Sequence, residues 1–232
     1  MQEMKCTVAH VRQLNDFVYQ VWLKPDEPVA FYAGQYLMVV MGAGDLRPFS
    51  IASLPEQPEL LELHIGAVPE NPYAWEVLTQ IREAGELTVQ VPGGEACYRS
   101  TAAEPLILIA GGTGFSYTWS ILREHLKQPD PTPITLYWGG RELTDLYLHR
   151  EVQELAARHP EFTYRPVLEQ PPADWQGARG LVHHAVLQEV AQLSRHRIYV
   201  AGRFEMVRVV RDDLALRNFP ADQLHGDALS FI

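Results

Sequence analysis

The sequence predicts a two-domain protein, with an N-terminal antiparallel β-barrel over residues 1–99 and a C-terminal α/β domain with an open parallel sheet over residues 103–232. Before about residue 100, short runs of alternating or β-branched residues are separated by Pro, Gly and Asp, a pattern typical of antiparallel strands. After that point, apolar strand-like runs alternate with helical patterns, as in a parallel sheet built from βα units. The small, polar residues 98–105 between the two patterns are expected to form the linker.

The first domain is expected to contain six strands and one helix. The helix has clear end signals, because Asn71 is a suitable N-cap, Pro72 stands at the first helical position and Gly85 provides a C-terminal stop. Short strands with turn residues between them close into a barrel or pack as a sandwich. The strand-like runs are residues 5–14, 17–24, 35–41, 48–53, 60–68 and 86–92.

The second domain repeats a strand, a turn and a helix four times. This order predicts an open sheet with helices on both faces, and ligands of such sheets bind beyond the carboxyl ends of the strands. The helix at residues 142–158 carries mixed charges and is expected to present a solvated face. The strands are predicted at residues 106–110, 134–140, 162–170 and 197–202, and the other helices at residues 116–127, 181–193 and 203–218.

The composition argues against several classes of function. The chain has 232 residues, of which 47% are hydrophobic and 21% charged, and a formal net charge of -10. Nucleic acids and anionic membranes attract clustered Lys and Arg, so an acidic chain is a poor partner for both. No stretch approaches the ~20 apolar residues of a membrane span, and the first residues lack the apolar region of a signal peptide. We therefore expect a cytoplasmic protein without nucleic-acid or membrane partners.

The cysteines and histidines do not indicate a metal site. Cys6 and Cys97 are far apart in the sequence, which supports neither a disulfide framework nor a zinc or iron–sulfur site, and both are expected to be reduced thiols. The nine histidines show no metal-ligand spacing. His183 and His184 begin a predicted helix, where neighbouring side chains point in different directions, so we expect surface or capping residues.

A glycine turn follows the first strand of the second domain. Gly111, Gly112 and Gly114 lie at the carboxyl end of that strand, directly before a helix, and Thr113 adds a hydroxyl donor. Glycines let backbone N–H groups approach a phosphate, whose charge the helix dipole favours. A tight strand–helix turn without a ligand is the alternative. The spacing fits neither G-x-G-x-x-G nor a P-loop, so an ordinary Rossmann dehydrogenase and an NTPase are poor fits.

A second candidate lies in the first domain, where Arg47 precedes Ser50 by three residues. In a straight strand, residues 47 and 49 point to one side and residues 48 and 50 to the other, so Arg47 and Ser50 face one groove only if Pro48 bends the chain. Taken alone, the segment is better explained by a surface arginine and a strand serine.

In combination, these motifs resemble the ferredoxin–NADP reductase superfamily over essentially the whole chain. Within it, the chain is most similar to bacterial NAD(P)H–flavin reductases of the Fre and LuxG type, and Tyr117 stands, as in those reductases, where many relatives have proline. The motifs follow the family's order: GQY at residues 34–36, RPFS at 47–50, GGTG at 111–114, W-x-G-x-x-G-x-V at 175–182 and YVAGRFEM at 199–206.

The resemblance implies a flavin site in the first domain. It implies that Ser50 is the catalytic residue, hydrogen-bonded to flavin N5 while a hydride passes from nicotinamide C4 to N5. Arg47 is expected near the ribityl or phosphate end of the flavin, with Pro48 and Phe49 in the pocket wall, although Phe49 also suits the core. The further flavin-binding candidates are His64, Tyr117 and Phe231, of which Tyr117 suits a packing role equally well.

NADPH or NADH is the expected electron donor. Arg141 follows the second strand of the nucleotide domain, where an arginine accepts a 2′-phosphate, whereas the adjacent Glu142 favours a free hydroxyl, so the choice of nucleotide stays open. Met206 suits the site and the core equally. The resemblance implies nucleotide contacts by Gly111, Gly112, Thr113, Gly114, Phe115, Arg141, Gly202, Arg203 and Glu205.

One departure from the family bears on how the flavin is held. Relatives that retain FAD carry a G-x-x-[ST] turn before the barrel helix, which holds the flavin pyrophosphate. Here Gly66 is followed by Ala67 and Val68, and the helix begins at Asn71 and Pro72 without that turn. Losing several phosphate hydrogen bonds weakens binding by orders of magnitude. We therefore expect FMN, riboflavin or FAD to be an exchangeable substrate and not a prosthetic group.

The sequence thus predicts a monomeric NAD(P)H:flavin oxidoreductase that releases reduced flavin to a flavin-dependent monooxygenase, a luciferase or ferric iron. The alternative is a reductase that holds FAD and passes electrons to a protein partner. A third alternative is a regulatory nucleotide-binding module of the same superfamily, but the C-terminal cysteine cluster of those modules has no counterpart in this sequence.

Overall fold

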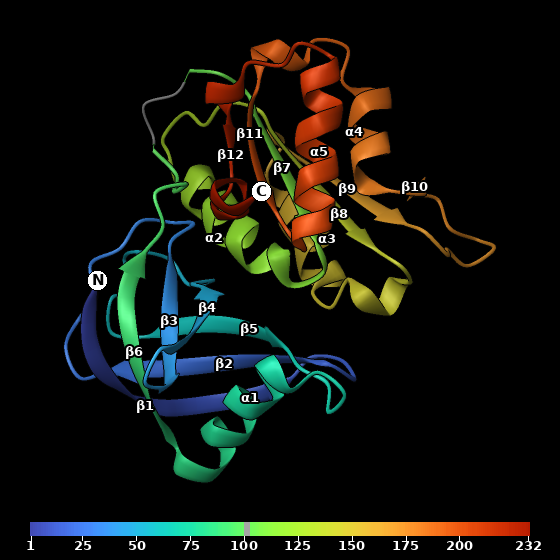
Figure 1. The fold of residues 1–232 in the computed structure, drawn as a ribbon. Coiled ribbons are helices and arrows are strands. Elements are labelled where there is room, and N and C mark those ends of the chain that lie inside the picture. Colours follow the sequence, from blue (N-terminus) through green and yellow to red (C-terminus); the bar gives the residue numbers. More distant parts are fainter. Residues whose placement is uncertain (100–102) are drawn as a thin grey trace.

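The computed structural model describes residues 1–99 and 103–232. They form a curled antiparallel sheet, in the lower part of Figure 1, and a parallel sheet flanked by helices, in the upper part. Residues 100–102 of the predicted linker lie outside the described residues, so the exact domain boundaries stay a prediction. Within the described part of the chain, no helix is long and apolar enough to span a bilayer.

The first sheet has six antiparallel strands in the order β4-β3-β6-β1-β2-β5. Its two outer strands approach each other, since the backbone N–H of Ala52, just after β4, donates to the carbonyl of Glu62 on β5 (2.7 Å). The predicted antiparallel barrel is thus confirmed. The strands are β1 (Gln2–Gln13), β2 (Val18–Pro25), β3 (Tyr36–Gly42), β4 (Asp45–Ser50), β5 (Leu61–Gly66) and β6 (Glu86–Gly93).

Helix α1 (Pro72–Ala84) lies against the barrel and has the predicted ends. The Asn71 side chain accepts a hydrogen bond from the backbone N–H of Tyr73, and Pro72 occupies the first helical position, where its missing N–H costs nothing. Gly85 ends the helix in the left-handed conformation with φ of 67°, which glycine adopts without strain. Three local signals in the sequence therefore defined both ends of the helix.

The second sheet is parallel and has the strand order β10-β9-β8-β7-β11-β12. Leu106 and Leu108 of β7 point to one face, which α2 and α3 cover, while Ile107 and Ile109 point to the other, which α4 and α5 cover (Figure 1). The predicted open sheet is confirmed. Its strands are β7 (Leu106–Gly111), β8 (Ile134–Gly140), β9 (Phe162–Leu168), β10 (Ala178–Arg179), β11 (Arg197–Ala201) and β12 (Leu224–His225), and its helices are α2 (Phe115–Leu126), α3 (His149–Arg158), α4 (Val182–Glu189) and α5 (Phe204–Leu216).

The helix predicted at residues 142–158 begins only at His149. A short 3₁₀ turn (Leu143–Asp145) precedes it, because the carboxylate of Asp145 accepts hydrogen bonds from the backbone N–H groups of Arg141 and Glu142. Leu146 and Leu148 follow this turn and are buried in the core beneath α2. The expectation of a solvated face was therefore wrong for the first part of this segment.

Candidate functional site

The glycine turn joins β7 to α2 and packs directly against the turn between β11 and α5. Gly111 ends β7, and residues 112–114 form a single 3₁₀ turn before α2 begins at Phe115. A Cβ on Gly114 would overlap the carbonyl of Ala201, and one on Gly111 would overlap the sulfur of Met206. Close packing against backbone therefore requires a glycine at 114, whereas at Gly111 the neighbour is the flexible side chain of Met206, which belongs to the packing of this turn. Two of the predicted nucleotide motifs are thereby brought together at the carboxyl edge of the sheet.

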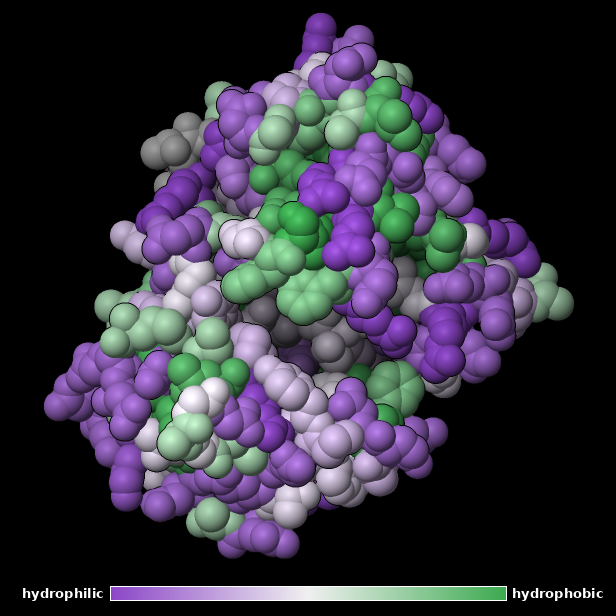
Figure 2. Space-filling view, in the orientation of Figure 1, coloured by the Kyte–Doolittle hydropathy of each residue, from purple (hydrophilic) through white to green (hydrophobic). Residues whose placement is uncertain are grey.

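The barrel meets the glycine turn through the end of β5. A Cβ on Gly66 would lie 3.0 Å from Cγ2 of Thr113, so the two chains almost touch. The backbone bond from Ala52 to Glu62 brings the segment just after Ser50 beside β5, and β5 in turn contacts both β4 and the turn that carries Thr113. Figure 2 shows a recess across the middle of the molecule, between the two domains.

Ser50 is available for a ligand. It is half-buried at the end of β4, opposite Tyr36 of β3, and its hydroxyl makes no hydrogen bond within residues 1–99 and 103–232. A hydroxyl that is neither buried nor paired within the fold can donate to an atom that enters the recess.

Arg47 does not share a groove with Ser50. The pairing of β4 with β3 continues through Pro48 without a shift, so the strand is not bent and Arg47 points to the opposite side from Ser50. The expectation of a common groove was therefore wrong. Phe49, on the side of Arg47, packs against the barrel core, whereas Pro48 is exposed on the side of Ser50.

The guanidinium of Arg47 reaches the first turns of α1. It donates to both oxygens of Asp45 (2.9 and 2.6 Å), to Glu76 (2.7 Å) and to the backbone carbonyl of Tyr73 (2.5 Å), and it lies over the Tyr73 ring at 5.0 Å. The neighbouring guanidinium lowers the pKa of Asp45, mainly through the hydrogen bond. The one buried cation of this rim, among the residues described, is thus paired with two carboxylates.

His64 lies in the domain interface and not in an open site. Its side chain is fully buried, with Nε2 2.9 Å from Glu62 and Nδ1 3.1 Å from the hydroxyl of Tyr147. Its ring is also nearly parallel to that of Phe115, at 6.2 Å between centroids. A flavin could reach the His64 side chain only by displacing these partners, and its flavin-binding role stays a prediction.

Tyr117 and Phe115 are also buried. The hydroxyl of Tyr117 donates to the carbonyl of Ala96 (2.5 Å), and burial raises its pKa well above the usual value. Phe115 stacks on Trp138 with centroids 3.7 Å apart. Tyr117 thus packs in the core, while its contact with a flavin stays a prediction, and the buried Phe115 has its backbone to offer a nucleotide.

A buried polar network that no sequence motif indicates joins the two domains. Glu62 on β5 accepts hydrogen bonds from Gln20 (2.6 Å) and lies 3.5 Å from Arg123 of α2. Burial would raise the pKa of Glu62, but the partners His64, Arg123 and Gln20 together hold it below the usual value. Tyr147 completes this network from the segment predicted as a solvated helix. These contacts fix the two sides of the recess relative to each other.

The remaining nucleotide candidates lie at the same edge of the parallel sheet. Arg141 follows β8 with its side chain 71% exposed, and Glu142 beside it is exposed as well. Arg203 and Glu205 are exposed at the start of α5, and Gly202 lies half-buried before them. No contact among the described residues decides between a 2′-phosphate and a free hydroxyl at Arg141.

The C-terminal aromatic candidate is exposed. Phe231 has 74% of its surface in solvent, and its ring meets that of Phe204, at the start of α5, edge-on at 6.2 Å. Its contact with a flavin ring stays a prediction. The nearby Asp227 is half-buried with a carboxylate oxygen close to Gly94 of the barrel domain, and its partial removal from water raises its pKa to about 6.

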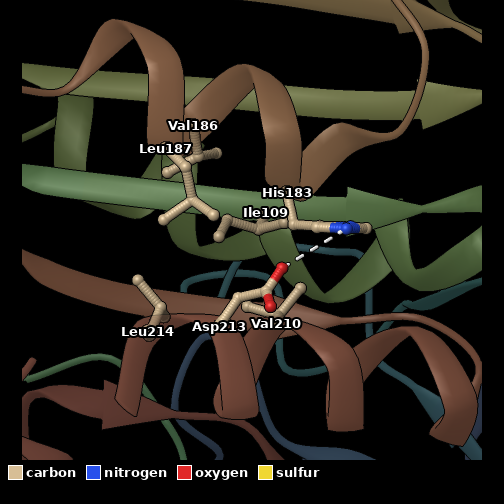
Figure 3. Close-up of a pocket in the computed structure, with 7 residues that line it drawn as sticks. All are labelled: Ile109, His183, Val186, Leu187, Val210, Asp213 and Leu214. Carbon is tan, nitrogen blue, oxygen red and sulfur yellow. Dashed lines mark ion pairs between the residues drawn. The ribbon is translucent and has the colours of Figure 1, made fainter. Parts of the chain in front are cut away.

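One arrangement of possible metal ligands lies away from this edge, between α4 and α5. Figure 3 shows His183 beside Asp213, with 3.5 Å between Nε2 and Oδ2. The rings of His183 and His184 touch, with centroids 4.2 Å apart, so the expectation that they point apart was wrong. Among residues 1–99 and 103–232, these three are the group that could hold a metal ion, with ligand atoms within 4.8 Å of one another. The absence of a functional metal stays a prediction.

The fold and the two adjoining turns define a class, namely two-domain oxidoreductases in which a barrel faces a pyridine-nucleotide domain. Residues 108–212 match the family model of the oxidoreductase NAD-binding domain. The chain is similar to the solved ferredoxin reductase of carbazole 1,9a-dioxygenase, with a TM-score of 0.83 and 25% identity over 97% of this chain and 69% of that one.

Two curated relatives refine this class. The chain is 43% identical over 235 residues to the NAD(P)H-flavin reductase of Vibrio harveyi, which covers 99% of both chains. It is 34% identical over 188 residues to the reductase component of phenol 2-monooxygenase from a Pseudomonas species, which covers 80% of this chain and 53% of that protein. The chain belongs to the family of NAD(P)H-flavin reductases.

Proposed function

We propose that this protein transfers a hydride from NADH or NADPH to a free flavin, which enters the recess as a substrate and leaves it reduced. The hydride carries two electrons from nicotinamide C4 to flavin N5, and the nicotinamide and the flavin ring supply this reactivity. The protein contributes binding, stacking distance and hydrogen bonds. Family membership supports flavin reduction, and the amino end of α1 supports the substrate role of the flavin.

That helix end is the observation that carries the substrate role. A helix start is a ready phosphate site because its first N–H groups lack partners. In α1, Pro72 has no N–H, and the N–H of Tyr73 is bonded to the Asn71 side chain at 3.2 Å. Two donors that would hold a flavin pyrophosphate are thus missing, in keeping with the missing G-x-x-[ST] turn. A tightly retained FAD would need donors from elsewhere.

We assign the roles at the recess from these positions. Ser50 donates a hydrogen bond to flavin N5, where negative charge or a proton arrives during the transfer. Gly111, Gly112, Thr113 and Gly114 receive the nucleotide pyrophosphate at the start of α2, whose dipole favours the charge. Gly202, Arg203 and Glu205 border the nicotinamide, and Arg141 contacts the adenosine ribose.

The reduced flavin is proposed to serve a separate acceptor, such as a monooxygenase. The similarity to a monooxygenase reductase component supports such a partner but names none for this chain. We further propose that the protein works as a monomer in the cytoplasm. Size-exclusion chromatography with light scattering checks the monomer, with a mass near 26.3 kDa as the expected result.

The test is to desalt the purified protein and follow oxidation of NADH and NADPH while adding riboflavin or FMN. The proposal expects a colourless protein that is idle without flavin and shows saturation with it. A yellow protein whose NADPH oxidation requires a protein acceptor and ignores added flavin would instead establish the alternative, a reductase that retains FAD.

A further inference from the structure

Three side chains with metal-binding atoms converge at the pocket between α4 and α5. His183 and His184 lie on the first turn of α4, and Asp213 lies on α5. Nε2 of His183 is 3.5 Å from Oδ2 of Asp213 (Figure 3), which is long for a charge-assisted hydrogen bond. The same separation suits two ligands of one zinc ion, because bonds of about 2.0–2.2 Å at tetrahedral angles place the ligand atoms about 3.3–3.5 Å apart.

Both members of this pair have the form that a metal requires. The His183 side chain is 8% exposed, and burial, together with the neighbouring His184, lowers its pKa. The ring is therefore neutral at pH 7 and offers a lone pair. Within residues 1–99 and 103–232, no lysine or arginine forms an ion pair with Asp213, so the charge of this carboxylate is not already neutralised by a cationic side chain.

His184 completes a set of three ligands. Successive helix residues leave the axis about 100° apart, yet the rings of His183 and His184 touch, with centroids 4.2 Å apart. The ligand atoms of all three residues lie within 4.8 Å of one another. Since His184 is exposed, its ring can rotate toward a shared ion without disturbing the core. Two imidazoles and a carboxylate suit zinc and other divalent first-row metals, whereas Mg²⁺ and Ca²⁺ prefer oxygen ligands alone.

The pocket beneath these ligands is apolar. Apolar surroundings lower the local dielectric and strengthen the attraction between a divalent cation and the single carboxylate. The exposed His184 keeps the outer side of the cluster accessible, so an ion can enter from solvent. The apolar residues of the pocket are Ile109, Val186, Leu187, Val210 and Leu214.

We propose that His183, His184 and Asp213 bind a divalent transition-metal ion, for which Zn²⁺ is the probe, and that this ion links α4 to α5. The proposal departs from the expectation drawn from the spacing of the histidines, because the third ligand comes from a different helix. Three protein ligands leave a coordination position for water. The bound ion stabilises the folded nucleotide domain, and this role does not depend on the proposed flavin chemistry.

The test is a calorimetric titration of the protein, without a histidine tag and after treatment with a chelator, with ZnCl₂. Neither flavin nor pyridine nucleotide is present. The expected result is one Zn²⁺ bound per chain, whereas Mg²⁺ produces no binding heat. Zn²⁺ at roughly 100 times its Kd should raise Tm by about 5–10 °C. The visible absorption of bound Co²⁺ gives a second readout, since it responds to the ligands of the ion.

Two variants test the ligands. His184→Gln and Asp213→Asn should each weaken Zn²⁺ binding at least about tenfold, because even partners outside the coordination shell contribute such a factor. His184 is exposed, so its replacement should leave the circular dichroism spectrum unchanged. Asp212→Asn and His10→Gln are the matched controls, since each removes the same kind of group from an exposed position outside the cluster.

The inference is overturned if Zn²⁺ does not bind at micromolar concentrations, or if Mg²⁺ binds as well as Zn²⁺. It is also overturned if His184→Gln and Asp213→Asn bind Zn²⁺ as tightly as the two control variants, because the zinc would then be held adventitiously elsewhere on the surface.

Discussion

The nucleotide side and the flavin side of the recess differ in the donors that they offer to a phosphate group. On the nucleotide side, the glycine turn has no side chains between the ligand and the backbone, and its tight packing against Ala201 and Met206 fixes the backbone in place. On the flavin side, the donors at the rim are already bonded, Arg47 to carboxylates and Tyr73 to the helix cap. One side is prepared for a phosphate and the other is closed to it. Such a difference is expected of an enzyme that binds a pyridine nucleotide through its phosphates and a flavin that enters and leaves.

The largest combined effect, on activity and stability together, is expected on the nucleotide side, from Gly114→Ala. The new methyl group would overlap the carbonyl of Ala201 and displace the turn, and a shift of about 1 Å in a positioned site costs on the order of 100-fold in rate. We expect kcat/KM for NADH and NADPH to fall by about this factor. Steady-state kinetics measure it, and a thermal melt shows how much of the loss is stability.

Gly112→Ala is the matched control for that prediction. A Cβ on Gly112 would meet no protein atom within 4 Å, so the folded state suffers only the strain of its φ of 54°, which costs about 1 kcal/mol. If Gly112→Ala lowered the melting temperature as much as Gly114→Ala, close packing would not be the reason for the glycine at position 114.

Ser50→Ala tests the flavin side. Loss of one hydrogen bond to a site of developing charge lowers kcat by roughly 10–1,000-fold, whereas the melting temperature should not change, since the hydroxyl has no partner in the described fold. Stopped-flow measurement of flavin reduction isolates the hydride step. An unchanged rate of that step would remove Ser50 from the catalytic role.

Tyr147→Phe weakens the buried polar network that joins the two domains. It leaves Nδ1 of the buried His64 without its partner at 3.1 Å, which costs about 1–3 kcal/mol of unfolding free energy. Urea denaturation measures the loss. Tyr73→Phe is the control, since Tyr73 is exposed and bonds to Arg47 through its backbone carbonyl; equal losses in the two variants would contradict a structural role for the network.

The smallest effect is expected from Asp227→Asn, at the contact between the C-terminal segment and the barrel domain. Burial raises the pKa of Asp227 from 3.8 to about 6, so its ionisation destabilises the folded state. This cost is absent below about pH 4, grows between pH 4 and 6, and is complete above pH 6. The variant should therefore melt a few degrees higher, roughly 2–6 °C, at pH 7.5 and no higher at pH 4. A gain that is equal at both pH values would contradict this assignment.

Local signals in the sequence predicted the elements well, because they act within a few residues. Asn71, Pro72 and Gly85 placed α1, and apolar runs placed the parallel strands. The start of α3 was predicted wrongly, since the helical pattern continues through Leu146 and only the tertiary core shows that this segment is buried. Leu146 illustrates that the helical periodicity of apolar residues does not reveal which element of the fold packs against a side chain.

The site was only partly predictable for the same reason. The glycine turn and Ser50 could be proposed as site residues from the sequence because their residue types are needed wherever such a turn or donor occurs. The partners of Arg47 were not, because Glu76 lies 29 residues further along the chain on another element. The burial of His64 against Tyr147 was not foreseen either, because Tyr147 is 83 residues away. Which polar groups satisfy each other is a property of the folded chain.

The most direct test of the contrast between the two sides is to measure the dissociation constants of riboflavin, FMN and FAD for the desalted protein by quenching of flavin fluorescence. We predict that FAD and FMN bind no more tightly than riboflavin, because Arg47 and the N–H of Tyr73 at the rim are already bonded within the protein. If FAD bound orders of magnitude more tightly than riboflavin, the flavin side would hold a phosphate anchor, and the contrast between the two sides would be refuted.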